Sequence, residues 1–383
     1  MASRHGNGCL SLPVTCRHNK SMRKSFFIMG LFVVLCGMGG LFIQSCKQKS
    51  SPGKKESTAF TPFHFKERLS DYNFFQEPLR ELKANKVLLA YELATPLFTD
   101  YAVKNRFIFV PKSKPIQYKA DGVLDFPDST IIIKNFAYRN AGNKKIMIET
   151  RLLAKDPADS KWKVMNYLWN ADQTDAVKHI IGAKVPVTLL DDNDNTITTV
   201  YQVPNTNDCK RCHTNNDVLM PLGPKAANLN IVMPGQIVNQ LVQWTTLGVL
   251  KGMPAIGQVA RFPDWTDSSQ FSLDQRARAY LDINCAHCHT KGGDAFNTGL
   301  FLEYRQTDHN QLGIMKSPVS AGGGAGGLDY DIVPGDASRS VLLYRMDSRE
   351  PGTAMPELAR TVIHKEGIQL ITEWINRMPK QKK

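Results

Sequence analysis

Two five-residue strings in this chain combine cysteine and histidine at a spacing that can hold a porphyrin. They are CKRCH at 209–213 and CAHCH at 285–289, and both follow the pattern Cys-x-x-Cys-His. The two thiols of such a string can add across the two vinyl groups of one haem, and the histidine that follows can ligate the iron. Each string therefore predicts one covalently bound haem c. The residues concerned are Cys209, Cys212 and His213 for the first haem, and Cys285, Cys288 and His289 for the second.

Other chemistries use the same pair of cysteines. A bare Cys-x-x-Cys also occurs in thioredoxin-like redox pairs, in iron–sulfur sites and in half of a zinc site. The histidine after each pair favours haem, because the chain has only 9 histidines in 383 residues and two of them occupy this position. Haem iron exchanges single electrons, so the two motifs indicate electron transfer.

The second haem has a candidate for its sixth, distal ligand. Met355 lies in a loop-forming stretch after the second motif, and a thioether ligand raises the reduction potential of haem iron. For the first haem the sequence leaves the ligand open. The first choice is Met253, just after a predicted helix; the alternatives are Met220, Met233, His179 and an open position for a small ligand.

The residues before the first motif are predicted to form a β-rich domain over 60–204. Stretches rich in β-branched and aromatic residues recur there at short intervals, with turn residues between them. Closely spaced strands without intervening helices indicate an antiparallel, sandwich-like arrangement. The predicted strands are 105–111, 129–138, 144–154, 161–170, 183–190 and 196–204, and a helix is expected near 76–84.

Two further segments carry the motifs. Residues 205–268 are the first haem-binding segment, with a turn predicted directly before the motif and a helix over 235–251. Residues 269–383 are predicted to be a cytochrome c domain with the second haem, in which a Ser272–Gln275 capping box opens a helix that runs into the motif. The expected fold is multidomain: a β-rich N-terminal domain, then a mainly α-helical c-type cytochrome region.

The N-terminus is typical of an export signal. A basic stretch precedes the apolar run 26–43, which ends at Gln44-Ser45-Cys46, a loose lipoprotein cleavage pattern. We expect 1–45 to be a signal peptide, Cys46 to carry lipid and 46–59 to be a tether. An uncleaved membrane anchor is the alternative, because about 18 apolar residues can span a bilayer. Either way the protein would be exported to the periplasm or outer surface and anchored to a membrane.

Cysteine usage and charge agree with this location. Of the 8 cysteines, four lie at or before position 46 and the other four lie in the two motifs, which leaves none for a structural disulfide. The formal net charge is +13, yet no run of Lys and Arg is typical of a nucleic-acid-binding groove, so no nucleic-acid partner is expected. A basic surface suits an acidic redox partner or a membrane.

Longer strings across the chain carry a resemblance to a known family. They are YELATPLFTDYAVKNRF (91–107), DGVLDFPDSTIIIKNF (121–136), PNTNDCKRCH (204–213), GPKAANLN (223–230), RARAYLDINCAHCH (276–289), YDIVPGDASRSVLLYRM (330–346) and MPELAR (355–360). Over about 60–380 the chain resembles a bacterial family of exported diheme c-type cytochromes of otherwise unknown function. The resemblance implies haem binding and electron transfer at both motifs. It supplies no substrate and no sixth ligand for the first haem.

The expected function is single-electron transfer between an exported dehydrogenase and a respiratory cytochrome, rather than a stand-alone enzyme activity. One alternative is a diheme peroxidase-like enzyme in which the first iron has an open position. Another is a surface ligand-binding protein with structural haems, suggested by the aromatic residues Trp162, Tyr167 and Trp169 in the predicted strands.

Overall fold

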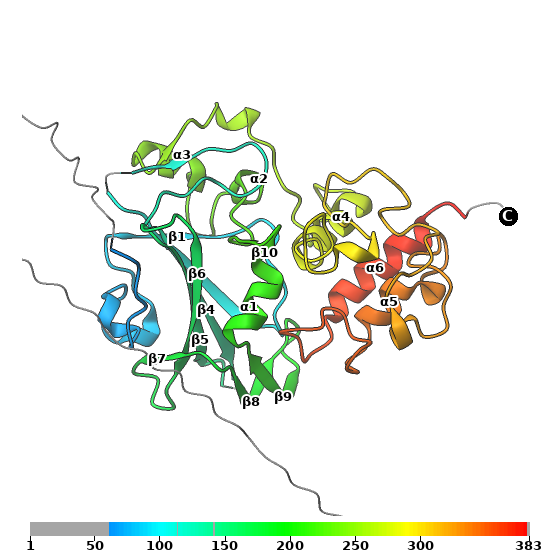
Figure 1. The fold of residues 1–383 in the computed structure, drawn as a ribbon, viewed down its shortest axis with the longest axis horizontal. Helices are drawn as coiled ribbons and strands as arrows, with labels where there is room; N and C mark the ends of the chain where they lie inside the picture. The colour runs from blue at the N-terminus through cyan, green and yellow to red at the C-terminus, as the bar shows by residue number, and fades with distance from the viewer. Residues whose placement is uncertain (1–60, 113, 141, 381–383) are drawn as a thin grey trace, which may run out of the picture. The chain divides into compact units, whose positions relative to one another are not determined.

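The computed structural model describes residues 61–112, 114–140 and 142–380. They belong to one compact unit, 58–383, whose first half forms a twisted sheet and whose second half forms short helices and loops (Figure 1). The predicted signal peptide 1–45, the lipid-attachment residue Cys46 and the tether 46–59 lie outside the described residues and stay predictions. Among the described helices, none has the length and apolar character needed to cross a membrane.

A six-stranded sheet forms the centre of the first half (Figure 1). Its strand order is β1-β2-β4-β5-β6-β7, and every neighbouring pair is antiparallel. The central strands are rich in β-branched and aromatic residues, which pack well on a pleated surface. The strands are β1 (Leu88–Tyr91), β2 (Val103–Phe109), β4 (Ile131–Arg139), β5 (Lys145–Lys155), β6 (Trp162–Trp169) and β7 (Ala176–His179).

Both faces of this sheet are covered, and strand β4 shows how. Ile131 and Ile133 pack on one face with apolar residues of the segment 63–82. Ile132 points to the other face, where it packs in a cluster with Trp244. Because side chains alternate along a strand, Lys134 shares the face of Ile132. This second face carries the residues discussed below.

A separate hairpin and two short strand pairs complete the β structure. The hairpin pairs β8 (Ala183–Leu190) with β9 (Thr196–Val203) and packs its apolar residues against the end of the large sheet. In its turn the Asp191 carboxylate accepts hydrogen bonds from the backbone N–H groups of Asn193 (2.9 Å) and Asn195 (2.8 Å). The short pairs are β3 (Ile116–Gln117) with β12 (Leu250–Lys251) and β10 (Thr214–Asn215) with β11 (Val218–Leu219).

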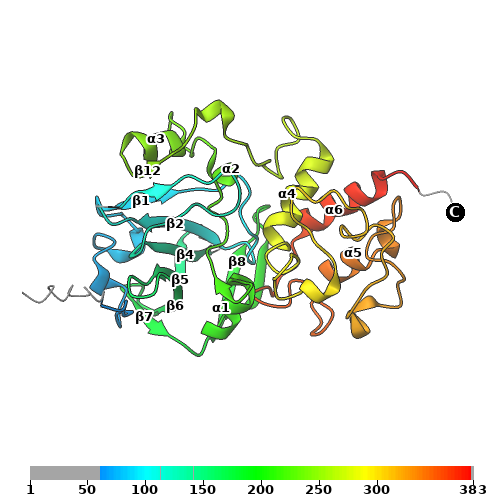
Figure 2. The same ribbon diagram turned by 45° about the horizontal axis from the view of Figure 1, so that its top comes forward.

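The α-helices follow the large sheet in the chain. Figure 2 shows α2 and α3 at one end of the sheet, and α4 beside α6 in the second half. The capping box that opens α4 is confirmed: Gln275 N–H donates to Ser272 Oγ (3.3 Å), and Ser272 N–H donates to Gln275 Oε1 (2.9 Å). The helices are α1 (Thr206–His213), α2 (Ala226–Leu229), α3 (Gln240–Thr246), α4 (Leu273–Asn284), α5 (Val341–Met346) and α6 (Lys365–Arg377).

The six predicted strands are confirmed to within about two residues at each end. The helices predicted near 76–84 and over 235–251 are shorter than predicted. Near 76–84 only the 3₁₀ turn Leu79–Glu81 forms, because Leu82 turns into the left-handed region with φ 51°. The helix predicted over 235–251 is limited to α3, since the Asn239 side chain caps its start and Gly248 (φ 70°) follows its end.

The predicted mainly α-helical cytochrome region over 269–383 is wrong. Its three α-helices are 12, 6 and 13 residues long, and long loops with short 3₁₀ turns separate them. Strands account for 25% of the protein and helices for 22%. Between the second motif and α5, left-handed glycines such as Gly313 and Gly326 interrupt the chain before a helical stripe can form. The sandwich-like arrangement is wrong as well, because one six-stranded sheet takes its place.

Candidate functional site

The first Cys-x-x-Cys-His motif lies in helix α1. We predicted that it would follow a turn, but Asn205 starts the helix four residues earlier. Its side chain accepts hydrogen bonds from Asn207 N–H (2.8 Å) and Asp208 N–H (2.9 Å), and the Asp208 carboxylate accepts from Asn205 N–H (3.1 Å). This reciprocal cap satisfies backbone groups that the helix leaves free. As a result Cys209 and His213, four residues apart, share one buried face.

His213 is held in the orientation of a metal ligand. Its ring Nδ1 lies 2.8 Å from the carbonyl oxygen of Met220. A ligating histidine commonly donates its other ring N–H to a backbone carbonyl, which fixes the tautomer and leaves Nε2 free for the metal. Burial, and then the charge of Lys134, lower the pKa of His213 to about 3. The imidazole is therefore neutral, as a ligand must be.

The second motif begins where α4 ends. Cys285 is the C-terminal cap of α4, so the helix, anchored by its capping box, sets the start of the motif. His289 Nδ1 lies 3.4 Å from the Thr298 hydroxyl, a longer contact than the one that holds His213. Burial, and then the charge of His287, lower the pKa of His289 to about 4. Burial also raises the pKa of the Cys285 thiol to about 12.

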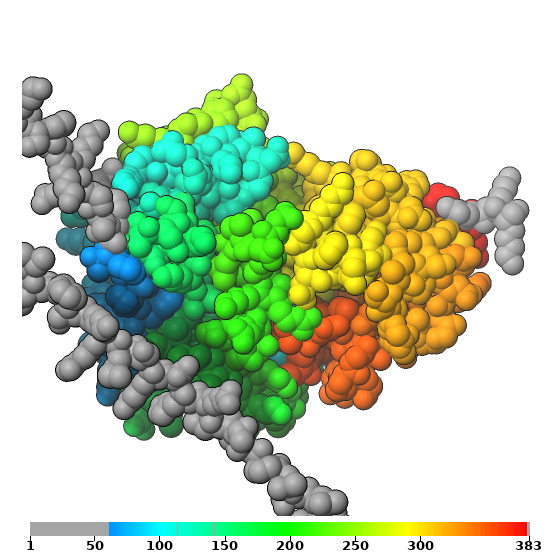
Figure 3. Space-filling view, in the orientation of Figure 1, coloured from blue at the N-terminus to red at the C-terminus, as the bar shows by residue number. Residues whose placement is uncertain are grey.

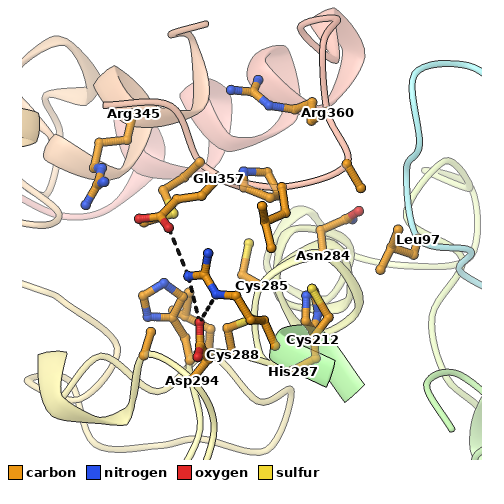
Figure 4. Close-up of a pocket in the computed structure, with 18 of the residues that line it drawn as sticks. Leu97, Cys212, Asn284, Cys285, His287, Cys288, Asp294, Arg345, Glu357 and Arg360 are labelled. Atoms are coloured by element: carbon orange, nitrogen blue, oxygen red, sulfur yellow. Dashed lines mark hydrogen bonds and ion pairs between the residues drawn. The ribbon is translucent and has the colours of Figure 1, made fainter. Parts of the chain in front are cut away.

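Both motifs line the same cavity. The space outside protein atoms in and around it measures about 2270 Å³, open solvent included. Its wall includes all six motif residues: Cys209, Cys212, His213, Cys285, Cys288 and His289. Figure 4 shows Cys212, His287 and Cys288 gathered on one side of it, with Cys285 nearby. The wall combines the second face of the sheet, α1, the end of α4, α5 and the loop around Met355. The fold thus brings together two motifs that begin 76 residues apart in the sequence.

The second cysteines of the two motifs, Cys212 and Cys288, lie close together in this cavity. Cys212 Sγ, Cys288 Sγ and a ring nitrogen of His287 lie within 4.8 Å of one another. The hydrogen bond between the two thiols lowers the pKa of Cys212 to about 4 and raises the pKa of Cys288 above its usual range. One proton is therefore shared by a pair of sulfur atoms.

The predicted distal residue Met355 lies on the wall of the cavity that both motifs line. Its N–H donates to the carbonyl oxygen of Arg345 (2.9 Å), and one ion pair links its loop to the first motif. Arg211 of the first motif pairs with Glu357 (3.0 Å) and with Asp294 (2.8 Å), as the dashed lines in Figure 4 mark. In the space-filling view, α1 in green meets the yellow segment after the second motif and the orange-red Met355 loop (Figure 3).

The structure does not bring Met253 to the cavity. It packs in the apolar cluster on the second face of the sheet, where the Thr245 hydroxyl lies 3.9 Å from its sulfur. Met233 and His179 do not line the cavity either; His179 Nε2 lies 2.8 Å from the carbonyl of Gly182. Met220 uses its carbonyl to orient His213. None of the three methionines considered for the first haem therefore lines the cavity; its methionines are Met346 and Met355.

A row of cations crosses the sheet behind the cavity. Lys134 lies opposite Arg106 and Arg151 in the strand register. Arg106 pairs with Glu92 (2.6 Å) and Arg151 pairs with Glu149, whereas Lys134 pairs with no carboxylate in the described part of the chain. Like charges directly opposite each other repel. Burial, followed by the two arginines, lowers the pKa of Lys134 to about 7.

Two further arginines on the wall also lack carboxylate partners among the described residues. Arg345 donates to the carbonyl of Thr353 (2.9 Å), and Arg360 donates to the carbonyl of Met346 (2.8 Å) while its Nε is buried without a partner. Figure 4 draws both arginines beside the Met355 loop. A cavity with two thiol pairs, two neutral imidazoles and surplus cations fits haem, since the porphyrin carries carboxylate side chains and needs thiols and axial ligands.

Three residues of this site had no sequence signal that we used: Lys134, Arg211 and His287. Arg211 and His287 occupy the variable positions of the motifs, which the spacing rule ignores. Lys134 stood inside a run of apolar strand residues, where a lone charge could have marked a face turned to a polar cavity. No family model, curated protein or solved structure matches this chain. Its membership of the diheme cytochrome family therefore stays a proposal.

Proposed function

We propose that this protein is a diheme c-type cytochrome that transfers single electrons. The observation that carries the proposal is the common cavity: both Cys-x-x-Cys-His motifs line it, and the sulfur atoms of Cys212 and Cys288 lie within 4.8 Å of each other. Each sulfur would be one bond from the edge of its porphyrin. The two porphyrin edges would then be neighbours, which favours electron exchange between them.

Attachment would use residues already present on the cavity wall. Each cysteine S–H adds across one vinyl C=C bond: the sulfur bonds one vinyl carbon and the proton ends on the other, so no atom is lost. His213 and His289 would be the proximal ligands and Met355 the distal ligand of the second haem. Lys134, Arg345 and Arg360 would neutralise propionates. The group supplies one-electron Fe(III)/Fe(II) chemistry, with one electron taken from a donor protein and passed to an acceptor.

Export and anchoring complete the proposal. A signal peptide over 1–45, lipid on Cys46 and a tether over 46–59 would keep the protein on a membrane outside the cytoplasm. Its partners would be redox proteins such as an exported dehydrogenase or a respiratory cytochrome. The family named above, exported diheme c-type cytochromes, is the one to which we assign it.

The decisive experiment counts haems on the full chain exported from a host that matures c-type cytochromes. Intact mass should equal the mature polypeptide plus two haems plus lipid, and a pyridine haemochrome assay should give two haems per protein. Replacing both cysteines of one motif with alanine should leave one haem. A mass of bare polypeptide, or of polypeptide with zinc alone, would overturn the proposal.

One observation favours a second candidate, a site for a soft metal ion. Two thiols and one imidazole within 4.8 Å are a common partial ligand set for zinc or copper. This function excludes thioethers at Cys212 and Cys288, so the two candidates compete for the same atoms. Metal analysis of the exported protein separates them: about one zinc or copper and no covalent haem supports the metal site.

A further inference from the structure

The iron of the proposed first haem lacks an assigned sixth ligand, and the cavity limits the choice. The wall residues outside the thiol and proximal positions that offer a nitrogen or sulfur ligand to it include Lys134, His287, His364, Met346 and Met355. Lys134 is already proposed to neutralise a propionate. Met355 is assigned to the second haem, and Met346 packs in the core cluster of the second half. His364 is engaged, because its Nδ1 lies 2.9 Å from the Tyr280 hydroxyl and its Nε2 lies 3.6 Å from Glu366.

His287 differs from His364 in having a free ring nitrogen. Its Nδ1 is buried and has no hydrogen-bond partner in the described structure. Leaving a buried polar group unpaired costs about 1–3 kcal/mol, so such groups call for an explanation. A ligand atom of the same ring lies within 4.8 Å of Cys212 Sγ, the attachment atom of the first haem. The same ligand atom lies within 4.8 Å of Cys288 Sγ, so the ring lies between the attachment atoms of the two proposed haems, although it belongs to the second motif by sequence.

We propose that His287 supplies the sixth ligand to the iron of the first haem. The inference rests on the proposed diheme function and deepens it. His213 reaches the cavity from α1, whereas His287 reaches it from the segment after α4, so the two imidazoles come from different walls. The first iron would be filled by two histidines, which disfavours the peroxidase-like alternative with its open position.

Two functional consequences follow from this ligand. Bis-histidine iron has a lower potential than iron with histidine and methionine, so the first haem would be the electron donor and the Met355-ligated haem the acceptor. In addition, His287 is bonded in sequence to Cys288, which carries the second porphyrin. One residue would then connect the first iron to the second haem, and the direction of electron flow within the protein would be fixed.

Carbon monoxide binding to the reduced, full-length exported protein tests the inference. Wild type should bind no CO, because both irons are filled. His287→Ala should bind one CO per protein, Met355→Ala should bind one, and the double variant should bind two. Each protein should keep two haems by pyridine haemochrome, which separates this test from the test of the haems themselves.

A second substitution at position 287, one that still offers a ligand atom, covers the case in which His287→Ala fails to attach its haems. His287→Met should retain a filled first iron but replace the bis-histidine signature in near-infrared magnetic circular dichroism with a second histidine–methionine signature, and should raise the lower potential. His364→Gln is the matched control and should change neither. The inference is overturned if wild type already binds one CO, or if both His287 variants leave the ligation spectrum and CO stoichiometry unchanged while two haems are attached.

Discussion

Asp100 holds the Met355 loop to the β-rich half of the protein. Its carboxylate is 1% exposed and accepts hydrogen bonds from the backbone N–H groups of Thr361 (2.9 Å) and Val362 (2.9 Å) and from the Thr361 hydroxyl (2.8 Å). Asp100 itself has φ 44°, a left-handed conformation that aspartate tolerates better than most residues. The loop carrying the proposed distal ligand is thus fixed from a segment 255 residues earlier in the chain.

The energetic effect of removing this carboxylate can be worked out from its partners. In Asp100→Ala two buried N–H groups lose their acceptor, at about 1–3 kcal/mol each, while the hydroxyl can rotate to another partner. We expect the free energy of unfolding to fall by about 4 kcal/mol. Asp100→Asn keeps one oxygen for the two N–H groups and its amide can donate to the Thr361 hydroxyl, so a loss of about 1 kcal/mol is expected.

Denaturant unfolding of the exported protein measures both values, and the long-wavelength sulfur–iron absorption of the proposed second haem would report the Met355 loop in the same samples. The alanine variant should weaken that band more than the asparagine variant. Asp121→Ala is the control, since Asp121 makes an exposed pair with Arg305 and should change stability by less than about 0.5 kcal/mol. Equal stability of wild type and Asp100→Ala would refute the reasoning, as would equal damage by both substitutions.

Two further predictions concern the same loop and its surroundings. Arg211→Gln removes two partly exposed ion pairs, with Asp294 and Glu357, worth about 1 kcal/mol together. We expect the variant to bind added imidazole at the proposed ferric second haem about fivefold more tightly than wild type. High salt should screen both pairs in wild type and remove this difference, and equal affinity at low salt would contradict the prediction. Burial lowers the pKa of His364 to about 4 although Glu366 raises it, so the unfolded chain takes up the proton first as pH falls. The free energy of unfolding should therefore fall by about 3 kcal/mol as the pH is lowered from about 6.5 to about 4. His364→Gln should abolish that part of the pH dependence. Parallel profiles of unfolding free energy against pH for wild type and variant would count against the prediction.

The sequence was most informative where chemistry or short-range pattern decides the structure. The strands from 131 to 203 were predictable because β-branched runs alternate with turn residues over short distances. The start of α4 was predictable because Ser272 and Gln275 satisfy each other's backbone groups locally. The six motif residues could be selected by spacing alone, since a porphyrin dictates that spacing, and they line one cavity.

Contacts between residues far apart in the chain could not be predicted from the sequence. Nothing near Asp100 in the sequence indicates Thr361, and nothing near Arg211 indicates Glu357, because each pair is formed only when the two halves fold together. The helical content of 269–383 was overestimated because three short helical patterns were taken to represent the whole segment, whereas long loops separate the helices. Met253 does not line the cavity because it packs instead, partly buried, against the apolar cluster on the second face of the sheet.

The contacts across the cavity argue that the two proposed haem sites are one unit. Arg211 lies between the two cysteines of the first motif, yet its charge is balanced by Asp294, which follows His289 in the chain, and by Glu357, which follows Met355. His287 lies between the two cysteines of the second motif, yet its ring meets Cys212 of the first. One variable position of each motif therefore contacts the site of the other motif. A change of charge or position at one haem would be felt at the other through these two side chains, so the two reduction potentials should respond together to a substitution at either position.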